Sequence, residues 1–245
     1  VVALVDEDAA RVEHGAHGAV EEHDLGGVGE PREQRGPRRV GGFSHIAAIY
    51  RTPDTVMHLI TGAAGFIGAH LAHQLHAEGS PLLLVDFAPD ALKQRNLEGL
   101  EAHPRRDAAE VFVAGAELPD LGAHADSMSA VWHLGANSDT TTRDWQHLLH
   151  VNVGASQQLW RWCARHGVPF YYASSAATYG DGGMGFSDRT PPERLTPLNL
   201  YGKSKNDFDA WVLEQVASGA PQPPRWAGFK FFNVYGAREG HKGRM

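Results

Sequence analysis

The stretch Leu59–Gly68 constrains the fold of this chain more than any other part of its sequence. A short apolar run from Val56 to Ile60 is typical of a buried strand, and glycines follow it at positions 62, 65 and 68. An apolar helical pattern begins among these glycines. Strand, glycine turn and helix in this order are the context that a dinucleotide-binding turn requires.

Each of the three glycines has a separate physical role in such a turn. Gly62 allows the tight turn, Gly65 lets the backbone approach a pyrophosphate, and Gly68 lets the helix pack closely on the strand. The N–H groups and the positive dipole end of the helix then face the phosphates. Glycine is common here, with 28 residues, so an ordinary glycine-rich loop is the alternative interpretation.

A second apolar run supports the nucleotide site. Leu82 to Val85 is continuously apolar and ends in Asp86, about 20 residues beyond the glycines, where an acid that contacts the adenosine ribose belongs. Asp86 by itself favours NAD, whose ribose hydroxyl is free. Lys93 follows shortly after it and could neutralise the 2′-phosphate of NADP, so both cofactors stay open at this point.

Composition limits the class of protein. A chain of 245 residues with 42% hydrophobic content can bury one substantial core. A net charge of -7 argues against nucleic acid as the main partner. No apolar run approaches the roughly 20 residues of a membrane span, and the N-terminus does not resemble a signal peptide. The single cysteine, Cys163, suits a reducing compartment. We therefore expect a cytoplasmic protein without nucleic acid or membrane as partner.

Residues 1–56 differ from the rest of the chain. Gly, Glu, Arg and His are scattered through Val12–Gly42 without helical or strand periodicity. Such a segment cannot bury enough surface to offset its ordering entropy, so we expect a disordered extension over 1–56. Its histidines lack accompanying cysteines or paired acids, and no metal site is expected. Met57 stands where a chain of this fold would begin, which suggests that the extension is translated from ahead of the true start.

From Met57 onward, apolar strands alternate with helical segments, which predicts a doubly wound, Rossmann-type α/β domain over 57–245. Strands are expected near 57–61, 81–86, 110–114, 129–134, 168–174 and 227–234. Helices are expected near 66–79, 91–100, 140–166 and 199–218. Right-handed crossovers place the loops after each parallel strand along one edge of the sheet, where ligands bind.

Ser175, Tyr201 and Lys205 form a candidate proton-transfer set. Ser175 follows the expected fifth strand, and Tyr201 and Lys205 stand at i and i+4, on one face of a helix. A tyrosine near pKa 10 is a poor base at neutral pH, but a neighbouring lysine ammonium lowers the pKa of the phenol. The serine hydroxyl can hydrogen-bond the same substrate oxygen. Tyr-x-x-x-Lys also occurs by chance on solvated helices, so its context decides the interpretation.

Together these motifs resemble the extended short-chain dehydrogenase/reductase family, whose members are mostly nucleotide-sugar epimerases, dehydratases and reductases. The resemblance covers 57–245. Ser175-Ala176-Ala177 lacks the acidic pair that dehydratases of this family carry at that point. Within the family, the segments Tyr172–Gly180, Pro197–Gly202 and Phe232–Gly243 are similar to the 6-epimerases of ADP-heptose. The run Arg-Glu-Gly-His-Lys-Gly in the last segment is the most specific.

The resemblance implies an NADP-dependent isomerase that oxidises and reduces C6 of ADP-heptose for the synthesis of lipopolysaccharide inner-core heptose. It makes Tyr201 and Lys242 the acid/base groups on the two sides of C6, and Ser175 and Asn233 substrate contacts. NAD stays possible. The implied cofactor contacts are Gly62, Gly65, Phe66, Ile67, Gly68, Asp86, Phe87, Lys93, Leu134, Gly135, Ala136, Asn137, Ser138, Asn152, Lys205, Val234 and Lys242.

Two features qualify these expectations. Asn152 lies in an apolar run, which favours a structural role in tying its helix to the active-site strand. The family continues beyond the His-Lys-Gly loop into a C-terminal substrate domain, whereas this sequence ends at Met245, so we expect a truncated chain with little or no activity. The family also forms homo-oligomers. The alternatives are an enzyme acting on another nucleotide sugar and a non-catalytic nucleotide-binding fragment.

Overall fold

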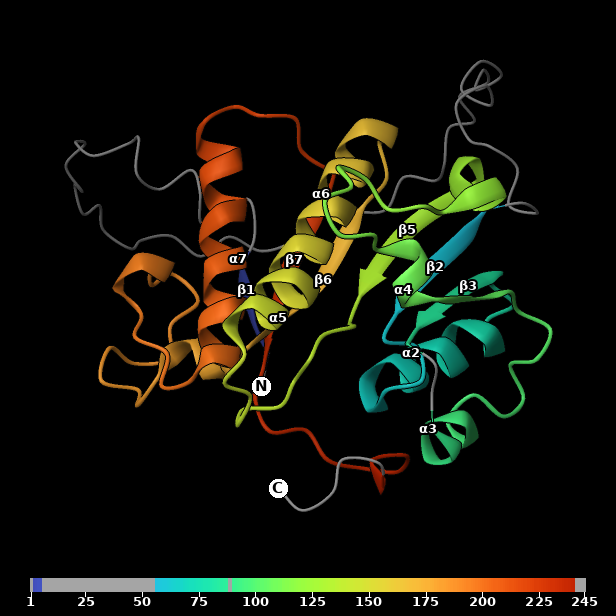
Figure 1. Ribbon diagram of the computed structural model, residues 1–245, viewed down its shortest axis with the longest axis horizontal. Helices are drawn as coiled ribbons and strands as arrows, with labels where there is room; N and C mark the ends of the chain where they lie inside the picture. Colours follow the sequence, from blue (N-terminus) through green and yellow to red (C-terminus); the bar gives the residue numbers. More distant parts are fainter. Residues whose placement is uncertain (1, 6–55, 88–89, 241–245) are drawn as a thin grey trace, which may run out of the picture.

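A seven-stranded sheet organises residues 2–5, 56–87 and 90–240, the part of the chain that the computed structural model describes (Figure 1). Its spatial order is β1-β7-β6-β5-β2-β3-β4, and every neighbouring pair except β1 and β7 is parallel. The strands are β1 (Val2–Val5), β2 (Met57–Thr61), β3 (Leu82–Asp86), β4 (Arg105–Asp107), β5 (Met128–His133), β6 (Phe170–Ser175) and β7 (Trp226–Phe231).

The six parallel strands have the Rossmann order. Counted along the chain from β2, they lie in the order 3-2-1-4-5-6 of dinucleotide-binding folds. The strand order therefore reverses between β2 and β5, which is where such folds bind their ligands. The predicted fold class is confirmed.

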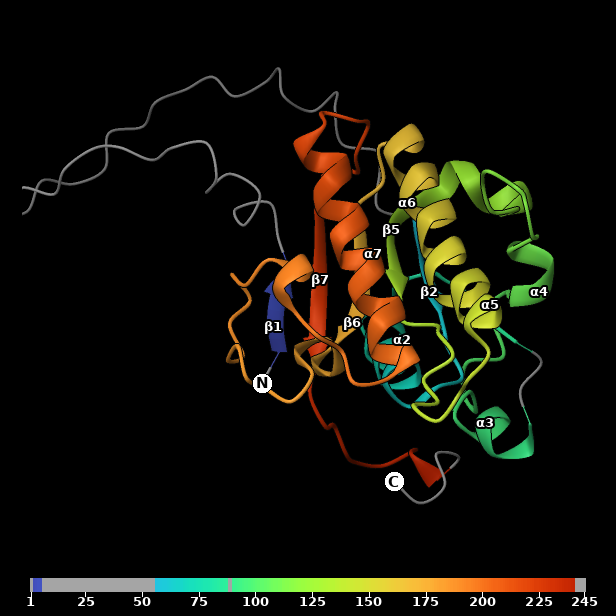
Figure 2. The same cartoon turned by 60° about the vertical axis from the view of Figure 1, so that its left-hand side comes forward.

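Helices cover both faces of this sheet. The long helices α6 (Ala155–His166) and α7 (Leu200–Ala217) lie side by side over one face, as both views show (Figure 2). Helix α2 (Phe66–Ala77) packs against β2 and β3. The shorter helices are α3 (Ala91–Arg95), α4 (Ala108–Val111) and α5 (Trp145–Leu148), and a π-helical segment, Leu149–Gly154, joins α5 to α6. Among the described residues, no helix combines the length and apolarity needed to cross a membrane.

The alternation of side chains along the strands builds two separate cores. In β2, Leu59 points into a large cluster with Trp160, Phe170 and Phe208, whereas Ile60 points into a smaller cluster on the other face. All of these side chains are buried. Period-two alternation places successive residues on opposite faces, so a parallel strand with both faces covered is apolar throughout.

The strand expected near 110–114 is wrong. The third parallel strand is β4, Arg105–Asp107, and the apolar residues after it belong to helix α4. The Asp107 carboxylate accepts a hydrogen bond from the Ala109 N–H at 2.8 Å and so starts this helix. Val111 reaches the core from the helix instead of from a strand. An apolar run too short to show a period does not distinguish the two cases.

Several other boundaries differ from expectation. The helix expected over 91–100 ends as an α-helix at Arg95. The helix expected over 140–166 begins at Trp145, because the Asp144 carboxylate caps the His147 N–H at 3.0 Å. Strand β7 ends at Phe231, three residues before its expected end at position 234.

Strand β1 departs from the expectation of a disordered extension. Val2–Val5 pair antiparallel with β7 at one edge of the sheet (Figure 2). The sequence Val-Ala-Leu-Val has a high strand propensity, and β7 offers it an edge with free backbone groups. Residues 6–55 lie outside the described residues, and for them the expectation stays a prediction.

Candidate active site

The glycine turn after β2 has the geometry that the sequence predicts. Gly62 has φ +66°, which favours glycine, and a Cβ atom there would lie 2.7 Å from the Gly135 Cα. A Cβ atom on Gly68 would lie 2.1 Å from the Gly62 carbonyl oxygen. Gly65 is the N-cap residue of α2. The turn therefore packs so tightly against α2 and the loop after β5 that larger residues would displace one of them.

Asp86 lies beside this turn at the end of β3. Its Oδ2 atom accepts a hydrogen bond from the Ala64 N–H at 2.8 Å. Burial raises the pKa of the Asp86 carboxyl, and the hydrogen bond from Ala64 and the ammonium of Lys93 oppose that rise. The predicted acid and lysine thus act on each other electrostatically, and Phe87 between them is half exposed.

A cavity of about 590 Å³ extends from Asp86 between α3 and β4. Ala63 of the glycine turn lines it, together with three arginines: Arg95, Arg105 and Arg106. The two residues from β4 were not among the predicted cofactor contacts, because a strand was expected further along the chain. Their guanidinium groups lie beside the place where the sequence predicts the adenosine end of a dinucleotide. Glu98 and Glu101 line the same cavity, and Arg106 pairs with Glu110 and Asp120.

Asn152 joins three elements of the site. Its Oδ1 atom accepts a hydrogen bond from the Asn137 N–H at 2.8 Å, and its Nδ2 atom donates to the Asn137 carbonyl oxygen and to the Ser204 Oγ atom, both at 2.9 Å. The Ser204 hydroxyl in turn donates to the Tyr201 carbonyl oxygen at 2.7 Å. Asn152 therefore ties the loop 134–138 to α7, and the structural interpretation of this residue fits its contacts.

His133 at the end of β5 was not singled out from the sequence. Its Nδ1 atom lies 2.7 Å from the Thr61 Oγ1 atom, and its Nε2 atom lies 2.8 Å from the Ser156 Oγ atom. Burial lowers the pKa of His133 to about 3, and the charge of Lys205 contributes to the shift. The neutral ring thus links β2 to α6 beneath the glycine turn.

Ser175, Tyr201 and Lys205 come together where β6 ends and α7 begins. The Ser175 side chain lies beside the Tyr201 phenol and lowers the pKa of that phenol. Its Oγ atom accepts a hydrogen bond from the Ala177 N–H at 3.1 Å. The Nζ atom of Lys205 donates to the Ala173 carbonyl oxygen at 2.8 Å. Helix α7 begins here because the Asn199 side chain caps the Gly202 N–H at 2.8 Å.

The net effect of the protein on the pKa of Tyr201 is to raise it, contrary to expectation. Burial raises the pKa of this phenol, the hydrogen bond from Ser175 lowers it, and the charge of Asp209 raises it. Burial also lowers the pKa of Lys205 to about 8. The i and i+4 spacing places Tyr201 and Lys205 on one face of the helix. The Lys205 ammonium, however, donates to the carbonyl oxygen of Ala173 on β6. Tyr201 is therefore protonated at neutral pH in this environment.

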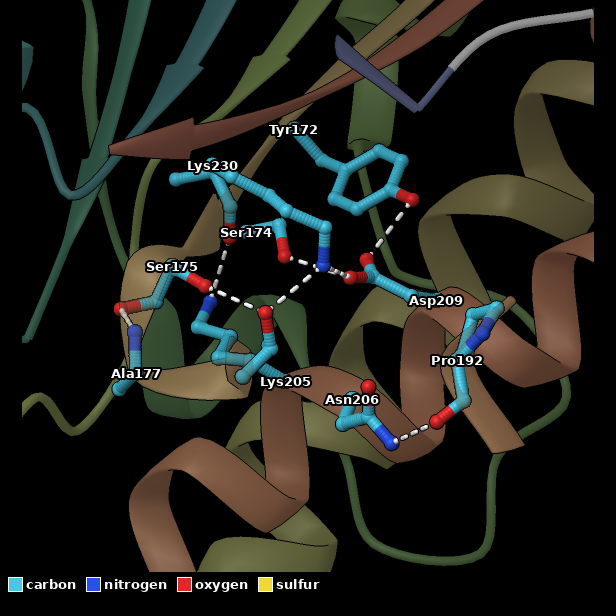
Figure 3. Close-up of polar contacts among 11 residues, drawn as sticks. Tyr172, Ser174, Ser175, Ala177, Pro192, Lys205, Asn206, Asp209 and Lys230 are labelled. Atoms are coloured by element: carbon cyan, nitrogen blue, oxygen red, sulfur yellow. Dashed lines mark hydrogen bonds and ion pairs between the residues drawn. The ribbon is translucent and has the colours of Figure 1, made fainter. Parts of the chain in front are cut away.

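A buried ion pair, Asp209–Lys230, lies close to the candidate proton-transfer set of Ser175, Tyr201 and Lys205. The Asp209 Oδ2 atom is 2.6 Å from the Lys230 Nζ atom, and neither side chain is more than 2% exposed. Asp209 also accepts hydrogen bonds from the hydroxyl groups of Tyr172 and Ser174 (Figure 3). Asp209 follows Tyr201 by eight residues on the same helix, and this spacing was the available sequence signal. The charge partner of Asp209, Lys230 on β7, is visible only in the fold.

The segment after β7 returns to the glycine turn. The Asn96 Nδ2 atom donates to the carbonyl oxygens of Ala64, at 2.9 Å, and of Arg238, at 3.1 Å. On this segment Asn233 is exposed and Val234 is partly buried. Lys242, the second predicted acid/base group, lies outside the described residues.

The family of the chain follows from a comparison with known proteins. The model of the NAD dependent epimerase/dehydratase family matches residues 58–245. The chain belongs to this family. Family membership and the Rossmann order of the strands make a nicotinamide dinucleotide the cofactor class, without deciding between NAD and NADP.

Two relatives in the epimerase/dehydratase family are similar over most of the chain. An ADP-L-glycero-D-manno-heptose-6-epimerase from Fusobacterium nucleatum subsp. nucleatum is 40% identical over 193 residues, which are 77% of this chain and 56% of the relative. The crystal structure of the Helicobacter pylori ADP-L-glycero-D-manno-heptose-6-epimerase has a TM-score of 0.60 and 27% identity, covering 78% of this chain and 59% of that one. The chain thus spans between half and two thirds of the length of these two relatives.

A solved structure of an enzyme with a different reaction has a similar fold. The structure of an NAD dependent NDP-hexosamine 5,6-dehydratase matches with a TM-score of 0.55 and 25% identity, covering 74% of this chain and 56% of that one. Family membership by itself therefore does not select epimerisation, and the site residues have to support it.

Proposed function

We propose that this chain carries the cofactor domain and the Tyr201 side of the active site of an ADP-glyceromanno-heptose 6-epimerase. Such an isomerase interconverts ADP-D-glycero- and ADP-L-glycero-D-manno-heptose by oxidation and reduction at C6, for lipopolysaccharide inner-core synthesis. The similarity to the two heptose epimerases supports this choice. We further propose NADP as cofactor, a homo-oligomer as the assembled form, and the cytoplasm as its location, which the free and buried Cys163 suits.

One observation carries the proposal: three separate motifs meet at the carboxyl edge of the parallel sheet. Gly62 abuts Gly135 in the loop after β5, Asn137 of the same loop bonds to Asn152, and Asn152 bonds to Ser204 on the helix of Tyr201. A short chain of contacts thus connects the glycine turn to the backbone of Tyr201 on α7. This is the arrangement that a redox enzyme of this family needs.

The residues at the glycine turn fit a dinucleotide. The turn leaves no room for a Cβ atom at Gly62 or Gly68, and it leads into the first turn of α2, a position that suits a pyrophosphate. Asp86 and Lys93 would hold the adenosine ribose, with Arg105 close by on β4. When bound, a nicotinamide dinucleotide supplies reversible hydride exchange with a carbinol carbon.

The side chains around Tyr201 supply proton transfer and orientation. The Tyr201 phenol, protonated at neutral pH, is placed to donate a proton to an oxygen at C6 as the carbonyl is reduced. The Ser175 hydroxyl, which lies beside the same phenol, would bind that oxygen and align it. We propose Lys242 as the group on the opposite side of C6, with Asn233 as a substrate contact.

Titration with NADPH and NADH tests the cofactor. Binding is followed by nicotinamide fluorescence excited through the six tryptophans. We expect NADPH to bind more tightly, and Lys93→Ala to weaken NADPH binding about tenfold while leaving NADH unchanged, because only NADP carries the 2′-phosphate. Arg165→Ala, in an exposed ion pair with Glu117, is the control. Equal affinities, unaffected by Lys93→Ala, would contradict the NADP proposal.

Paired nucleotide sugars test the substrate. ADP-D-glycero-D-manno-heptose and UDP-glucose are offered separately with NADP, binding is measured calorimetrically, and epimers are separated by chromatography. We expect ADP-heptose to bind preferentially, and Tyr201→Phe or Lys242→Ala to lower any turnover about 10²-fold or more. Preference for UDP-glucose supports an enzyme for another nucleotide sugar. Saturation by NADPH with neither sugar bound supports a non-catalytic fragment. That residues 1–245 alone are inactive stays a prediction of the same assay.

A further inference from the structure

The ion pair between Asp209 and Lys230 lies deeper than any other among the described residues. The Asp209 side chain has no exposed surface, and that of Lys230 is 2% exposed, whereas the Lys203–Asp207 pair on the same helix has side chains 50% and 35% exposed. Burying two charges costs several kcal/mol per ion unless each has further hydrogen bonds. Apolar side chains of similar volume in place of a buried ion pair often leave stability unchanged or raise it. Stability alone therefore does not explain the Asp209–Lys230 pair.

The pair connects the turn that carries Ser175 to helix α7. The Lys230 Nζ atom donates to the Thr178 Oγ1 atom at 2.8 Å, and the Thr178 hydroxyl donates to the Ser175 carbonyl oxygen at 2.8 Å. Asp209 holds the neighbouring strand residue, because its Oδ2 atom accepts from the Ser174 hydroxyl at 2.7 Å. Figure 3 shows the Asp209 carboxylate in contact with the Lys230 ammonium and with the hydroxyl groups of Tyr172 and Ser174 on β6.

The same pair sets the charge felt by the candidate proton-transfer groups. Asp209 acts on both Lys205 and Tyr201, each time raising the pKa. His133 on β5 is the other titratable group that faces Lys205, and it is neutral. Lys230 approaches from β7 and neutralises Asp209. Without Lys230, the full negative charge of Asp209 would act on its helix neighbours.

We propose that Asp209 and Lys230 are positioning residues of the candidate active site. Their ion pair holds the Ser175–Thr178 turn against α7 and so fixes the place of the Ser175 hydroxyl relative to the helix that carries Tyr201. The inference rests on the proposed function of Ser175 and Tyr201. Its tests measure the site in the full chain without substrate or cofactor, so they fail independently of the epimerase proposal.

The first test follows the lysine at position 205 by NMR of protein labelled with [ε-¹³C]lysine, assigned with Lys205→Met. We expect Asp209→Asn to lower the pKa of Lys205 and Lys230→Met to raise it, each by about one unit, because the two variants change the local charge in opposite directions. The double variant should return the pKa toward its starting value. Asp207→Asn, on the exposed pair of the same helix, is the control and should leave it unchanged.

Melting temperature separates this role from simple stability. Each single variant should lower it on the order of 10 °C, because one buried charge loses its partner, and the double variant should recover part of the loss. A pair that only stabilises the fold would lower the melting temperature and leave the NMR signals of the Tyr201 phenol unchanged in the folded variants. That result overturns the proposal.

Thr178→Val provides a test that keeps both charges in place. The substitution is nearly isosteric and removes only the hydroxyl between Lys230 and the Ser175 carbonyl. The ¹³Cζ resonance of Tyr201, read at neutral pH, reports hydrogen bonding of the phenol, and Ser175→Ala calibrates the loss of that bond. We expect Thr178→Val to move the resonance at least half as far as Ser175→Ala. An unmoved resonance in a folded Thr178→Val variant shows that the turn does not depend on the pair, and overturns the proposal even where the charge variants fail to fold.

Discussion

His133 shows how one buried side chain can make the stability of this domain depend on pH. Its ring bridges the Thr61 and Ser156 hydroxyl groups, and burial lowers its pKa to about 3. The unfolded chain takes up the proton near pH 6.5, whereas the folded protein resists it. The unfolded state therefore binds more protons between these two values, and protonation favours unfolding.

We expect the free energy of unfolding to be constant above pH 6.5 with respect to this group, and to fall as the pH drops toward 3. The slope contributed by His133 approaches 1.4 kcal/mol per pH unit, as an order of magnitude. Urea unfolding at several pH values measures it. His133→Phe should be less stable at pH 8 by about 1–3 kcal/mol, because the buried hydroxyl groups of Thr61 and Ser156 each lose one hydrogen bond, but should lose stability less steeply in acid. Parallel pH curves for the two proteins would refute this account.

The helical segment after the loop that follows β5 is irregular close to the candidate site. The segment Leu149–Gly154 is π-helical between α5 and α6, and such segments are often found at functional sites. Asn152 lies within it and directs its amide toward Asn137 and Ser204. The irregular turn thus brings one polar side chain to the loop 134–138 and to α7 at once.

Asn152→Leu should therefore loosen two elements together. It leaves the Asn137 backbone groups without their partner, and we expect a loss of about 2–4 kcal/mol in the free energy of unfolding. NADPH affinity should fall about tenfold or more, because the loop 134–138 lies against the glycine turn. Urea unfolding and NADPH titration measure the two effects. His150→Ala, an exposed neighbour on the same segment, is the control. Unchanged NADPH affinity in a destabilised Asn152→Leu protein would separate this residue from the cofactor site.

The two cores on either face of the sheet share the same strands, so they should unfold together. Trp160 is 1% exposed and contacts the rings of Phe170, Trp211 and Trp226 in the larger core. The smaller core, around Ile60 and Leu84, depends on the same β2 and β3. Neither helix layer can persist without the sheet that it covers.

Trp160→Ala should cost about 3–5 kcal/mol in the free energy of unfolding, because it leaves a large cavity in the core. The remaining transition should stay a single cooperative one, with far-UV circular dichroism and tryptophan fluorescence giving the same midpoint. Trp145→Ala, a half-buried residue that contacts Lys203 near the surface, is the matched control and should cost less. Separate midpoints for the two probes would indicate that the two faces unfold independently.

Local patterns determined much of this protein by themselves. Glycine spacing, two apolar strands ending in a turn and an acid, and the Tyr201–Lys205 spacing predicted the Rossmann fold, the place of the ligand edge, and the meeting of Ser175 with Tyr201. Each of these signals lies within a short stretch of the chain, where backbone conformation and periodicity act directly. The prediction for the run after Asp107 was wrong because this run is too short to show a period. The Asp107 carboxylate caps its first turn, and the run forms a helix.

Tertiary structure alone decided the electrostatics of the site. Asp209 and Lys230 are 21 residues apart in sequence, and Thr61 and His133 are 72 apart, so neither pair has a local signature. Whether a phenol or an ammonium is stabilised depends on burial and on charges brought from other strands, which is why Tyr201 has a raised pKa despite its lysine neighbour. Sequence spacing places side chains on one face of a helix; only the packed fold sets the charges and the solvent around them.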